Sequence, residues 1–286
     1  MSLDRRHAMK LSGAGIAALS IAPGRAAASS ETEPDIAEAA SGYFRALGYK
    51  ALPPLSLITD SDFNGGLRFD PTRRDFDPKG QFVIQRLARV ADAGNRDRPG
   101  VLASFTVIGL QGRVQDKPGD LLLHVLDFLT AHRALGSARM QFVSTASVFP
   151  LLETVGTVAD GNRIERSVAD ARQTADGAGV YAPEGHPFGV DITTVGIFYP
   201  VADGAVGPQP DHAPEGTVKI AEIGVGPARE GLSPVEYGLI GIERLALAEG
   251  RPLPDFEQTR LDLLRALERE AEERGKPLPP GYSAFA

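Results

Sequence analysis

The chain has 286 residues, no cysteine and a formal net charge of −7. Without cysteine there can be no disulfides, thiolate metal ligands or cysteine nucleophiles. The acidic balance disfavours nucleic-acid binding, which relies on clustered lysine and arginine, so we expect no nucleic-acid partner. No group of histidines and carboxylates has the spacing of a metal site, and we predict no metal.

The first 28 residues have the organisation of a removable export signal. Arg5 and Arg6 precede a short apolar stretch, residues 11–22, and small residues follow up to Ala28. This order is typical of secretory signals, and the paired arginines indicate the twin-arginine type. We therefore predict export to the periplasm or the cell exterior. We expect no stable membrane insertion, because no stretch reaches the roughly 20 apolar residues of a membrane helix. A disordered basic start on a cytosolic protein is the open alternative.

The remaining chain predicts a flexible start over residues 29–34 and a single domain over residues 35–286. Helical spacing of apolar residues predicts helices over 35–47, 120–133, 235–249 and 255–274. Apolar runs predict strands over 82–90, 101–109, 140–144, 190–199 and 217–225. Glu270 and Arg274 are expected to pair on the last helix. Strands that follow one another without helices favour antiparallel pairing, so we predict an α+β fold with a mostly antiparallel sheet flanked by helices.

Three blocks of residues stand in a specific order along this domain. The first comprises residues 43–49, 52–57 and 63–67. The second comprises residues 85–89, followed by Asp92 and Asn95 in an Arg-x-x-Asp-x-x-Asn spacing from Arg89, and continues at residues 104–109. The third is residues 236–245, which read Glu-Tyr-Gly-Leu-Ile-Gly-Ile-Glu-Arg-Leu.

In this order the blocks resemble the catalytic core of alanyl-tRNA synthetase, a class II aminoacyl-tRNA synthetase. The second block resembles class motif 2, and the third resembles class motif 3. The resemblance runs from about residue 36 to residue 250. It implies a class II synthetase-like fold and a homodimer.

The resemblance also implies a small-molecule site. Arg89 and Arg244 stand where the family holds the phosphates of ATP, and a guanidinium fork suits phosphate oxygens. The nucleotide site would comprise Arg89, Asp92, Phe105 and Arg244. Asn64, Glu236 and His186 would contact the substrate, with Glu236 holding its amino group. Ordinary structural functions remain open: each arginine can pair with a carboxylate, and His186 can be a solvated loop residue.

The chain also departs from the family pattern. The second motif 2 arginine and the acid that follows it are replaced in the stretches 100–102 and 104–106. The sequence contains no tryptophan, and we expect the tRNA-binding helices, the editing domain and the C-terminal domain of the family to be absent. Losing one phosphate clamp costs roughly 10²–10³-fold in rate, so ordinary alanine activation is not expected.

Three functions follow as alternatives. The first is a binding protein for an amino-acid-like or nucleotide-like small molecule that does not perform standard aminoacylation. The second is an ATP-dependent, carboxylate-activating ligase that forms an aminoacyl adenylate or an amide, and only this function requires ATP and Mg²⁺. The third is a structural or interaction protein in which the old pocket has collapsed.

Overall fold

The computed structural model describes ten segments of the chain: residues 32–58, 80–88, 90–98, 100–113, 119–148, 162–174, 178–181, 192–202, 214–225 and 235–286. The predicted export signal lies outside them, as do three predicted site residues, Asn64, Arg89 and His186. Within these segments no helix is long and apolar enough to cross a membrane.

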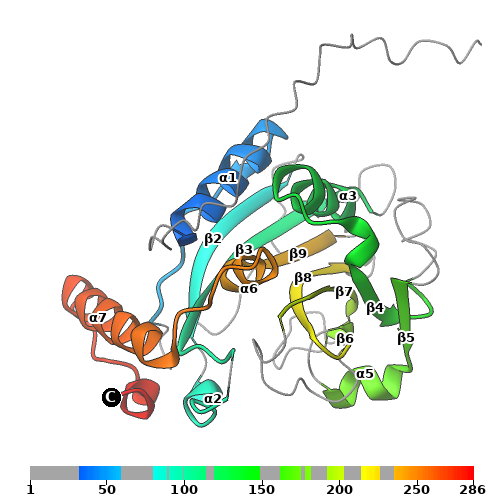
Figure 1. Cartoon of the computed structure of the whole chain (residues 1–286). Helices are drawn as coiled ribbons and strands as arrows, with labels where there is room; N and C mark the ends of the chain where they lie inside the picture. Colours follow the sequence, from blue (N-terminus) through cyan, green and yellow to red (C-terminus); the bar gives the residue numbers. More distant parts are fainter. Residues whose placement is uncertain are drawn as a thin grey trace, which may run out of the picture. The chain divides into compact units, whose positions relative to one another are not determined.

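The described strands form one sheet with an antiparallel centre (Figure 1). They are β1 (Lys50–Ala51), β2 (Gln81–Ala88), β3 (Ser104–Arg113), β4 (Gln141–Thr145), β5 (Arg163–Arg166), β6 (Gly179–Tyr181), β7 (Ile192–Pro200), β8 (Thr217–Val225) and β9 (Val235–Gly241). Their order is β1-β2-β3-β9-β8-β7-β4-β5, and β6 also pairs with β7. The parallel pairs, β1 with β2 and β4 with β5, lie at the two ends. The prediction of an α+β fold with a mostly antiparallel sheet is confirmed.

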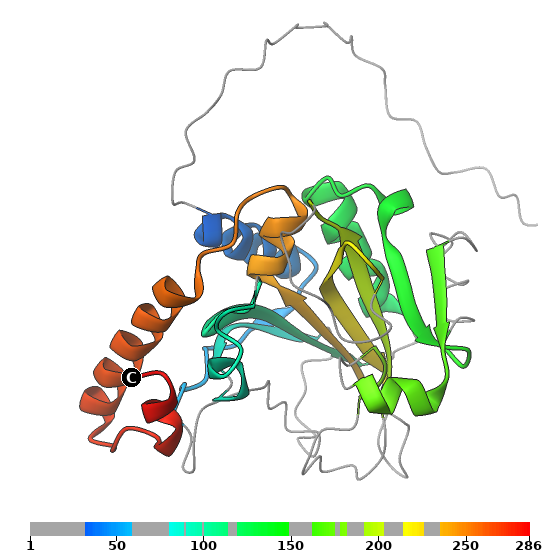
Figure 2. The ribbon, with the colours of Figure 1, turned by 60° about the horizontal axis from the view of Figure 1, so that its bottom comes forward.

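The described helices are α1 (Thr32–Ala46), α2 (Val90–Ala93), α3 (Asp120–Asp127), α5 (Val168–Thr174), α6 (Ile242–Ala248) and α7 (Phe256–Arg274). A π-helical turn, η1 (Phe128–His132), extends α3, and short 3₁₀ turns follow at η2 (Ser137–Arg139) and η4 (Pro280–Ala284). Helices α1, α3 and α6 lie on the same side of the sheet (Figure 2). We call the side that they cover the first face and the opposite side the second face.

Alternation along the strands builds the core of the first face. Ile108 and Leu110 of β3 and Ile240 of β9 are fully buried and belong to one cluster with Phe44 of α1 and Phe128 of η1. Side chains in a strand point alternately to its two sides, so the residues between them lie on the second face. The sheet therefore has one apolar face that helices cover, and a second face that carries the alternate residues of each strand, such as Phe105 and Gln111 of β3.

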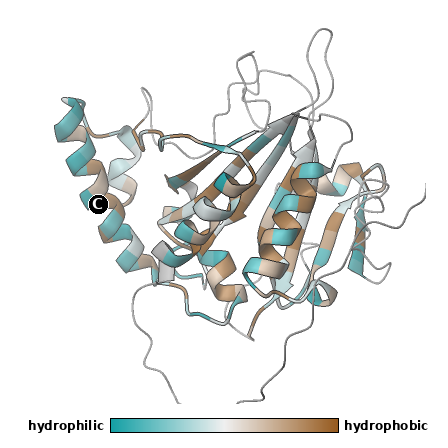
Figure 3. Cartoon of the chain, turned by 90° about the horizontal axis from the view of Figure 1, so that it is seen from above, coloured by the Kyte–Doolittle hydropathy of each residue, from teal (hydrophilic) through white to brown (hydrophobic). Residues whose placement is uncertain are grey.

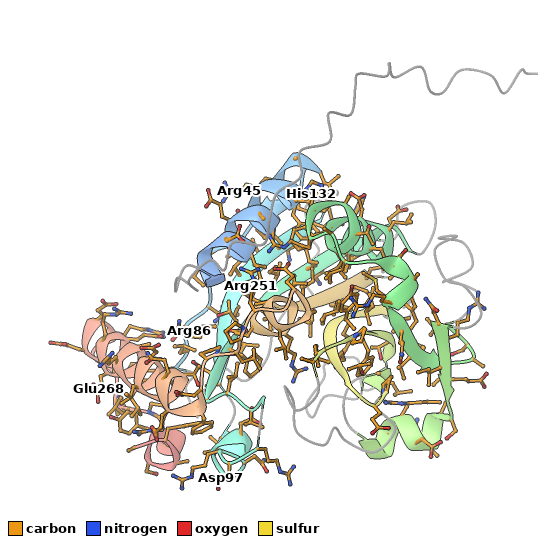
Figure 4. The ribbon with its side chains drawn as sticks, in the orientation of Figure 1. Arg45, Arg86, Asp97, His132, Arg251 and Glu268 are labelled. Carbon is orange, nitrogen blue, oxygen red and sulfur yellow. The ribbon has the colours of Figure 1, made fainter. Side chains whose placement is uncertain are left out.

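An ion network joins α1 to the end of α6. The guanidinium of Arg133 donates to both carboxylate oxygens of Glu249, at 2.6 and 2.8 Å. Arg251 also pairs with Glu249, and both arginines reach Asp35 of α1, at 3.4 and 3.5 Å. Figure 4 shows Arg251 between α1 and α6. Bidentate, partly buried pairs of this kind fix orientation more firmly than exposed single pairs do.

The prediction of one helix over residues 235–249 is wrong in its first half, which forms β9. Gly238 pairs with Leu110, and a Cβ added to it would lie 3.2 Å from the Cβ of Leu110. A residue without a side chain therefore lets β9 and β3 approach closely. Glycines at 238 and 241 also weaken helix formation, so the helix begins only at Ile242.

The segment that follows β1 is held by side chains in place of a strand ladder. The amide of Leu52 donates to Phe82 at 2.8 Å, but Pro53 and Pro54 have no N–H to continue the ladder. The side-chain amide of Gln85 takes their place, accepting from the Leu55 amide at 2.5 Å and donating to the Leu55 carbonyl at 3.0 Å. The Gln85 side chain therefore replaces the two ladder hydrogen bonds that a paired strand residue would make with Leu55.

Helix α7 anchors the same segment further along. Glu270 accepts from the Leu57 amide at 3.0 Å and from the Ser56 hydroxyl, and it pairs with Arg274 at 3.1 Å. The predicted Glu270–Arg274 pair is thus confirmed and has a structural function. Figure 3 shows hydrophilic residues along much of α7, whereas Leu263 and Leu267 are fully buried against the end of the sheet.

Gly80 offers a test of close packing at the start of β2. Its φ is +103°, and an added Cβ would lie 2.7 Å from a ring carbon of Tyr49 and 2.9 Å from the carbonyl oxygen of Gln111. We expect Gly80→Ala to lower the free energy of unfolding by about 3 kcal/mol, through backbone strain plus overpacking. The matched control is Gly250→Ala, where φ is +82° and nothing lies within 4 Å. It should lose only about 1 kcal/mol. Urea unfolding of both variants measures the difference, and equal losses would show that the contact with Tyr49 is unimportant.

Candidate functional site

The end of β9 brings together two of the predicted nucleotide-site residues. Val107 of β3 pairs with Gly241 of β9, and Phe105 lies two residues from Val107 on the same side of β3. Helix α6 begins directly after Gly241. The carboxylate of Glu243 in its first turn accepts the Thr106 amide at 2.7 and 3.0 Å, which fixes the start of α6 against β3.

Arg244 lies over Gly241 on the second face. A Cβ added to Gly241 would be 3.6 Å from both Cβ and Cδ of Arg244, which is van der Waals contact, so the arginine stem lies beside this glycine. Arg244 is exposed and Phe105 is half-buried. A guanidinium binds phosphate or carboxylate oxygens through a two-pronged contact, and an aromatic ring offers a surface on which a planar group can stack. This end of the second face has the chemistry of an anion site.

A β-bulge in β8 places a lysine and a glutamate on the same second face. The register of β7 against β8 shifts by one residue, with Ile220 as the extra residue. Ile220 and Ala221 are both buried in the first-face core. The bulge therefore aligns Lys219 and Glu222, which would point to opposite faces of a regular strand. Their ammonium and carboxylate groups are 2.6 Å apart.

This ion pair lies beside the Arg244 region. A Cβ added to Gly196 of β7 would be 2.7 Å from Cβ of Ala178, 2.9 Å from a ring carbon of Phe198 and 3.5 Å from Cδ of Lys219, so the lysine stem is packed beside these groups. Glu222 lies between Gly196 on β7 and the strand β9, two residues along β9 from Gly241. The strands β7, β8 and β9 are neighbours (Figure 1), so Lys219, Glu222 and Arg244 share one face of three adjacent strands.

Glu236 lies at the opposite end of β9 and on the first face. Its side chain is 1% exposed, and its carboxylate accepts the amides of Gly119 and, at 2.9 Å, Leu121, the first free amides of α3. Burial raises the pKa of Glu236 above its usual value, the two amides partly oppose this, and the nearby Asp120 adds to it. The assignment of Glu236 to a ligand's amino group remains a prediction, but in the structure both oxygens bind α3.

Polar aromatic contacts hold α1 and α3 together around this carboxylate. The Tyr49 hydroxyl lies 3.0 Å from Nδ1 of His124, and the Tyr43 hydroxyl donates to Asp127 at 2.8 Å. His132 lies 4.5 Å from the Tyr43 ring, between α1 and α3 (Figure 4). Burial lowers the pKa of His124, while Asp120 and Asp127 oppose it, so the ring is neutral at neutral pH and Nδ1 can accept. These groups are structural and face away from the Arg244 region.

The structure therefore unites some predicted site residues and separates others. Phe105 and Arg244 lie together on the second face. Asp92 lies in α2, directly after the hairpin strand β2, and its carbonyl accepts the Asn95 amide at 3.0 Å. Glu236 is on the other face. Sequence reasoning missed Lys219 and Glu222, because a bulge leaves no signal in the spacing of residues. Among the described residues no group of three or more histidines and carboxylates could hold a metal ion.

Comparison with known proteins finds likeness among solved structures alone. No family model and no curated protein matches the chain. Among solved structures, the chain is similar to apo histidyl-tRNA synthetase from S. aureus, with 12% sequence identity and a TM-score of 0.44. The likeness covers 87% of this chain and 81% of that one.

The buried carboxyl of Glu236 predicts a pH dependence of stability. Because its pKa is raised in the folded state, the folded protein holds the proton more tightly than the unfolded chain does. Its contribution to the unfolding free energy is therefore largest below the ordinary glutamate pKa and falls as pH rises through the raised value. In Glu236→Gln this fall should be missing. Urea unfolding between about pH 4 and pH 8 measures it.

The exposed Glu165 of β5 supplies the control. Glu165→Gln should keep the wild-type pH profile. If the Glu236→Gln profile ran parallel to the wild-type profile over the whole range, the raised pKa would be ruled out.

Proposed function

We propose that this protein is a divergent relative of the class II synthetase core that binds an anionic, amino-acid-like or nucleotide-like small molecule on the second face, without standard aminoacylation. The observation that carries the proposal is the position of Arg244. Its side chain lies over Gly241, and Phe105 lies on the same face of the adjacent strand. One cation and one aromatic ring at the end of a sheet can hold the charged end and the planar part of such a ligand.

The arrangement of the three sequence blocks supports the kinship. The second block supplies the adjacent strands β2 and β3, joined by a connection that contains α2. The third supplies β9 and α6, and β9 pairs with β3 along most of its length. The two blocks are more than a hundred residues apart in sequence but lie side by side in the sheet. Strand β2 ends at Ala88 opposite Ser104 of β3, at the same end of the sheet at which Val107 of β3 pairs with Gly241 and α6 begins.

The departures from the family pattern favour binding over turnover. The position expected to carry a family acid is Thr106, whose amide is engaged by Glu243 and whose side chain is buried. Gly100 occupies part of the stretch where the family has its second arginine. With fewer cations to stabilise the charge that develops during adenylate formation, a ligase of the ordinary kind is disfavoured. A panel of carboxylic acids with ATP, assayed for pyrophosphate release, separates a ligase from a binding protein.

Arg244→Ala tests the binding function. We expect calorimetric titration of the full chain with ATP and with a panel of amino acids to find a ligand whose dissociation constant rises at least tenfold in Arg244→Ala, through loss of charge-assisted hydrogen bonds. The matched control, Arg265→Ala, removes an arginine whose side chain is 74% exposed on α7, and it should bind as the wild type does. If Arg244→Ala bound as tightly as the wild type, the site would be misplaced. If no compound bound the wild type, the collapsed-pocket alternative would be favoured.

We further infer, from residues 1–28, that the protein works outside the cytoplasm after removal of a twin-arginine signal. Replacing both Arg5 and Arg6 with lysine should retain the full-length chain in the cytoplasm, while the wild-type chain should be recovered outside it in a shortened form. Cell fractionation followed by mass spectrometry of the intact protein measures both outcomes. The control is Lys10→Arg, which keeps the charge and the arginine pair. Export of the double variant at wild-type level would contradict the inferred route.

A further inference from the structure

We propose that Gln111 is the centre of a further binding subsite on the second face, where its side-chain amide donates a hydrogen bond to the carbonyl oxygen of a neutral amide group of a ligand. The inference rests on the proposed function in one respect, namely that small molecules bind this face of the sheet. It goes beyond that function by naming a place and a chemical group that do not involve Arg244.

A row of uncharged polar residues crosses the second face near the start of β9. Gln81 of β2 lies opposite Gln111 of β3, and Gln111 lies opposite Tyr237 of β9. On the other side of Tyr237, Gly224 of β8 adds no side chain to the row. Because Leu110 belongs to the core of the first face, its neighbour Gln111 and the residues opposite it lie on the second face. The strands concerned are neighbours in the sheet (Figure 1).

The middle amide of this row is buried without a full set of hydrogen bonds. Gln111 is 0% exposed. Its Oε1 accepts from Nε2 of Gln81 at 2.8 Å, which fixes the orientation of the amide. Its Nε2 makes no hydrogen bond of regular geometry with the described residues. Gln111 interacts with the Tyr237 hydroxyl and so opposes the rise in pKa that burial causes there. An amide nitrogen carries two hydrogens, so this contact leaves at least one of them without an acceptor.

A buried N–H group without an acceptor is unfavourable in the folded protein. The group gives up its hydrogen bonds to water and gains none in return, whereas an apolar side chain of the same shape would avoid this loss. Buried polar groups are almost always paired, so an exception requires a physical reason. A bound ligand that supplies an acceptor gives such a reason. The missing hydrogen bond then forms only in the complex.

The surroundings of Gln111 favour a neutral acceptor over an anion. Gln81, Gln111 and Gly224 carry no charge, and burial raises the pKa of Tyr237 to about 12, so its hydroxyl keeps its proton at neutral pH. A carboxylate bound there would be buried against neutral groups without a cation from the row, which is costly. Gln81 and Gln111 already pair amide to amide, and a ligand amide would extend this chain of hydrogen bonds.

Calorimetric titration of the full chain with two matched pairs of probes tests the inference. The pairs are L-glutamine with L-glutamate, and uridine monophosphate with ribose 5-phosphate. In at least one pair the compound with the amide should bind the wild type at least tenfold more tightly than its partner. The pair that shows this preference tells whether the amide belongs to an amino-acid side chain or to a nucleobase.

Gln111→Met, which keeps the length of the side chain and removes the donor, should abolish the preference. Its melting temperature should equal or exceed the wild-type value, because the unsatisfied N–H group is gone and the half-buried Gln81 can turn to water. The matched control is Gln141→Met. Gln141 is a glutamine of β4 that also has a buried atom without a partner but lies outside the row, so this variant should keep the wild-type preference.

A further variant decides the matter if Gln111→Met fails to fold. Gln81→Met removes the hydrogen bond that orients Gln111, and the preference for the amide compound should then fall several-fold. A preference that survives unchanged in Gln111→Met, or in Gln81→Met where the first variant does not fold, overturns the inference. Equal binding within both pairs, or no binding of any of the four compounds to the wild type, also overturns it.

Arg244→Ala separates the failure of this inference from the failure of the proposed function. If the preference is lost in Gln111→Met and Arg244→Ala binds as the wild type does, the Gln111 subsite stands and the assignment of Arg244 fails. If Arg244→Ala weakens binding while Gln111→Met leaves it unchanged, the proposed function stands and the Gln111 inference is wrong.

Discussion

The pairing of β3 with β9 is the constraint on which the rest of the molecule depends. It joins residues 107–113 to residues 235–241, which are more than a hundred positions apart in sequence. Two contacts make this pairing specific: Gly238 lets β9 approach Leu110 of β3 closely, and the carboxylate of Glu243 accepts a hydrogen bond from the Thr106 amide. Because β9 also pairs with β8, it sets the distance between the hairpin strands and the bulge. The proposed site lies at the end of β9, between its two neighbours β3 and β8.

Strand β9 also divides the charges of the protein between its two faces. Near its start it carries a carboxylate, buried among helices, that satisfies the first amides of α3. At its end it delivers an arginine to the second face. A helix N-terminus is a natural anion site, and here the chain supplies its own anion. The start of α3 is therefore satisfied within the fold, and the proposed site lies at the other end of β9.

The sequence predicted elements with strong periodic signals and missed those that depend on distant contacts. Helix α7 matches its prediction because Asp255 caps its start, Gly275 ends it in a left-handed conformation, and leucines repeat on one side. The prediction of a strand over residues 217–225 agrees with β8. Strand β9 was mistaken for helix because Leu239 and Ile240 continue into a true helix without a break in hydrophobicity. The short elements β5, α5 and β6 carried too little periodicity to be identified.

The candidate site was predicted in part, for the same reason. The resemblance to a known family pointed to Phe105 and Arg244, which the fold places on one face. The resemblance also assigned Glu236 to the substrate, and that assignment stays a prediction; the structure places Glu236 on the first face, where it binds the amides at the start of α3. The sequence could not predict that Lys219 and Glu222 lie on one face, because the bulge in β8 is visible only in its pairing with β7.

The two prolines after β1 affect whether a β-strand of another chain can pair with this edge of the sheet. Unprotected outer strands offer free amides and carbonyls on which a foreign chain can build. Between Leu52 and Leu55 the prolines supply no amides, and Gln85 occupies both polar groups of Leu55. A passing β-strand therefore finds no ladder to extend at this stretch. This stretch of the sheet edge therefore disfavours edge-to-edge pairing with another molecule, next to an edge strand, β1, that is only two residues long.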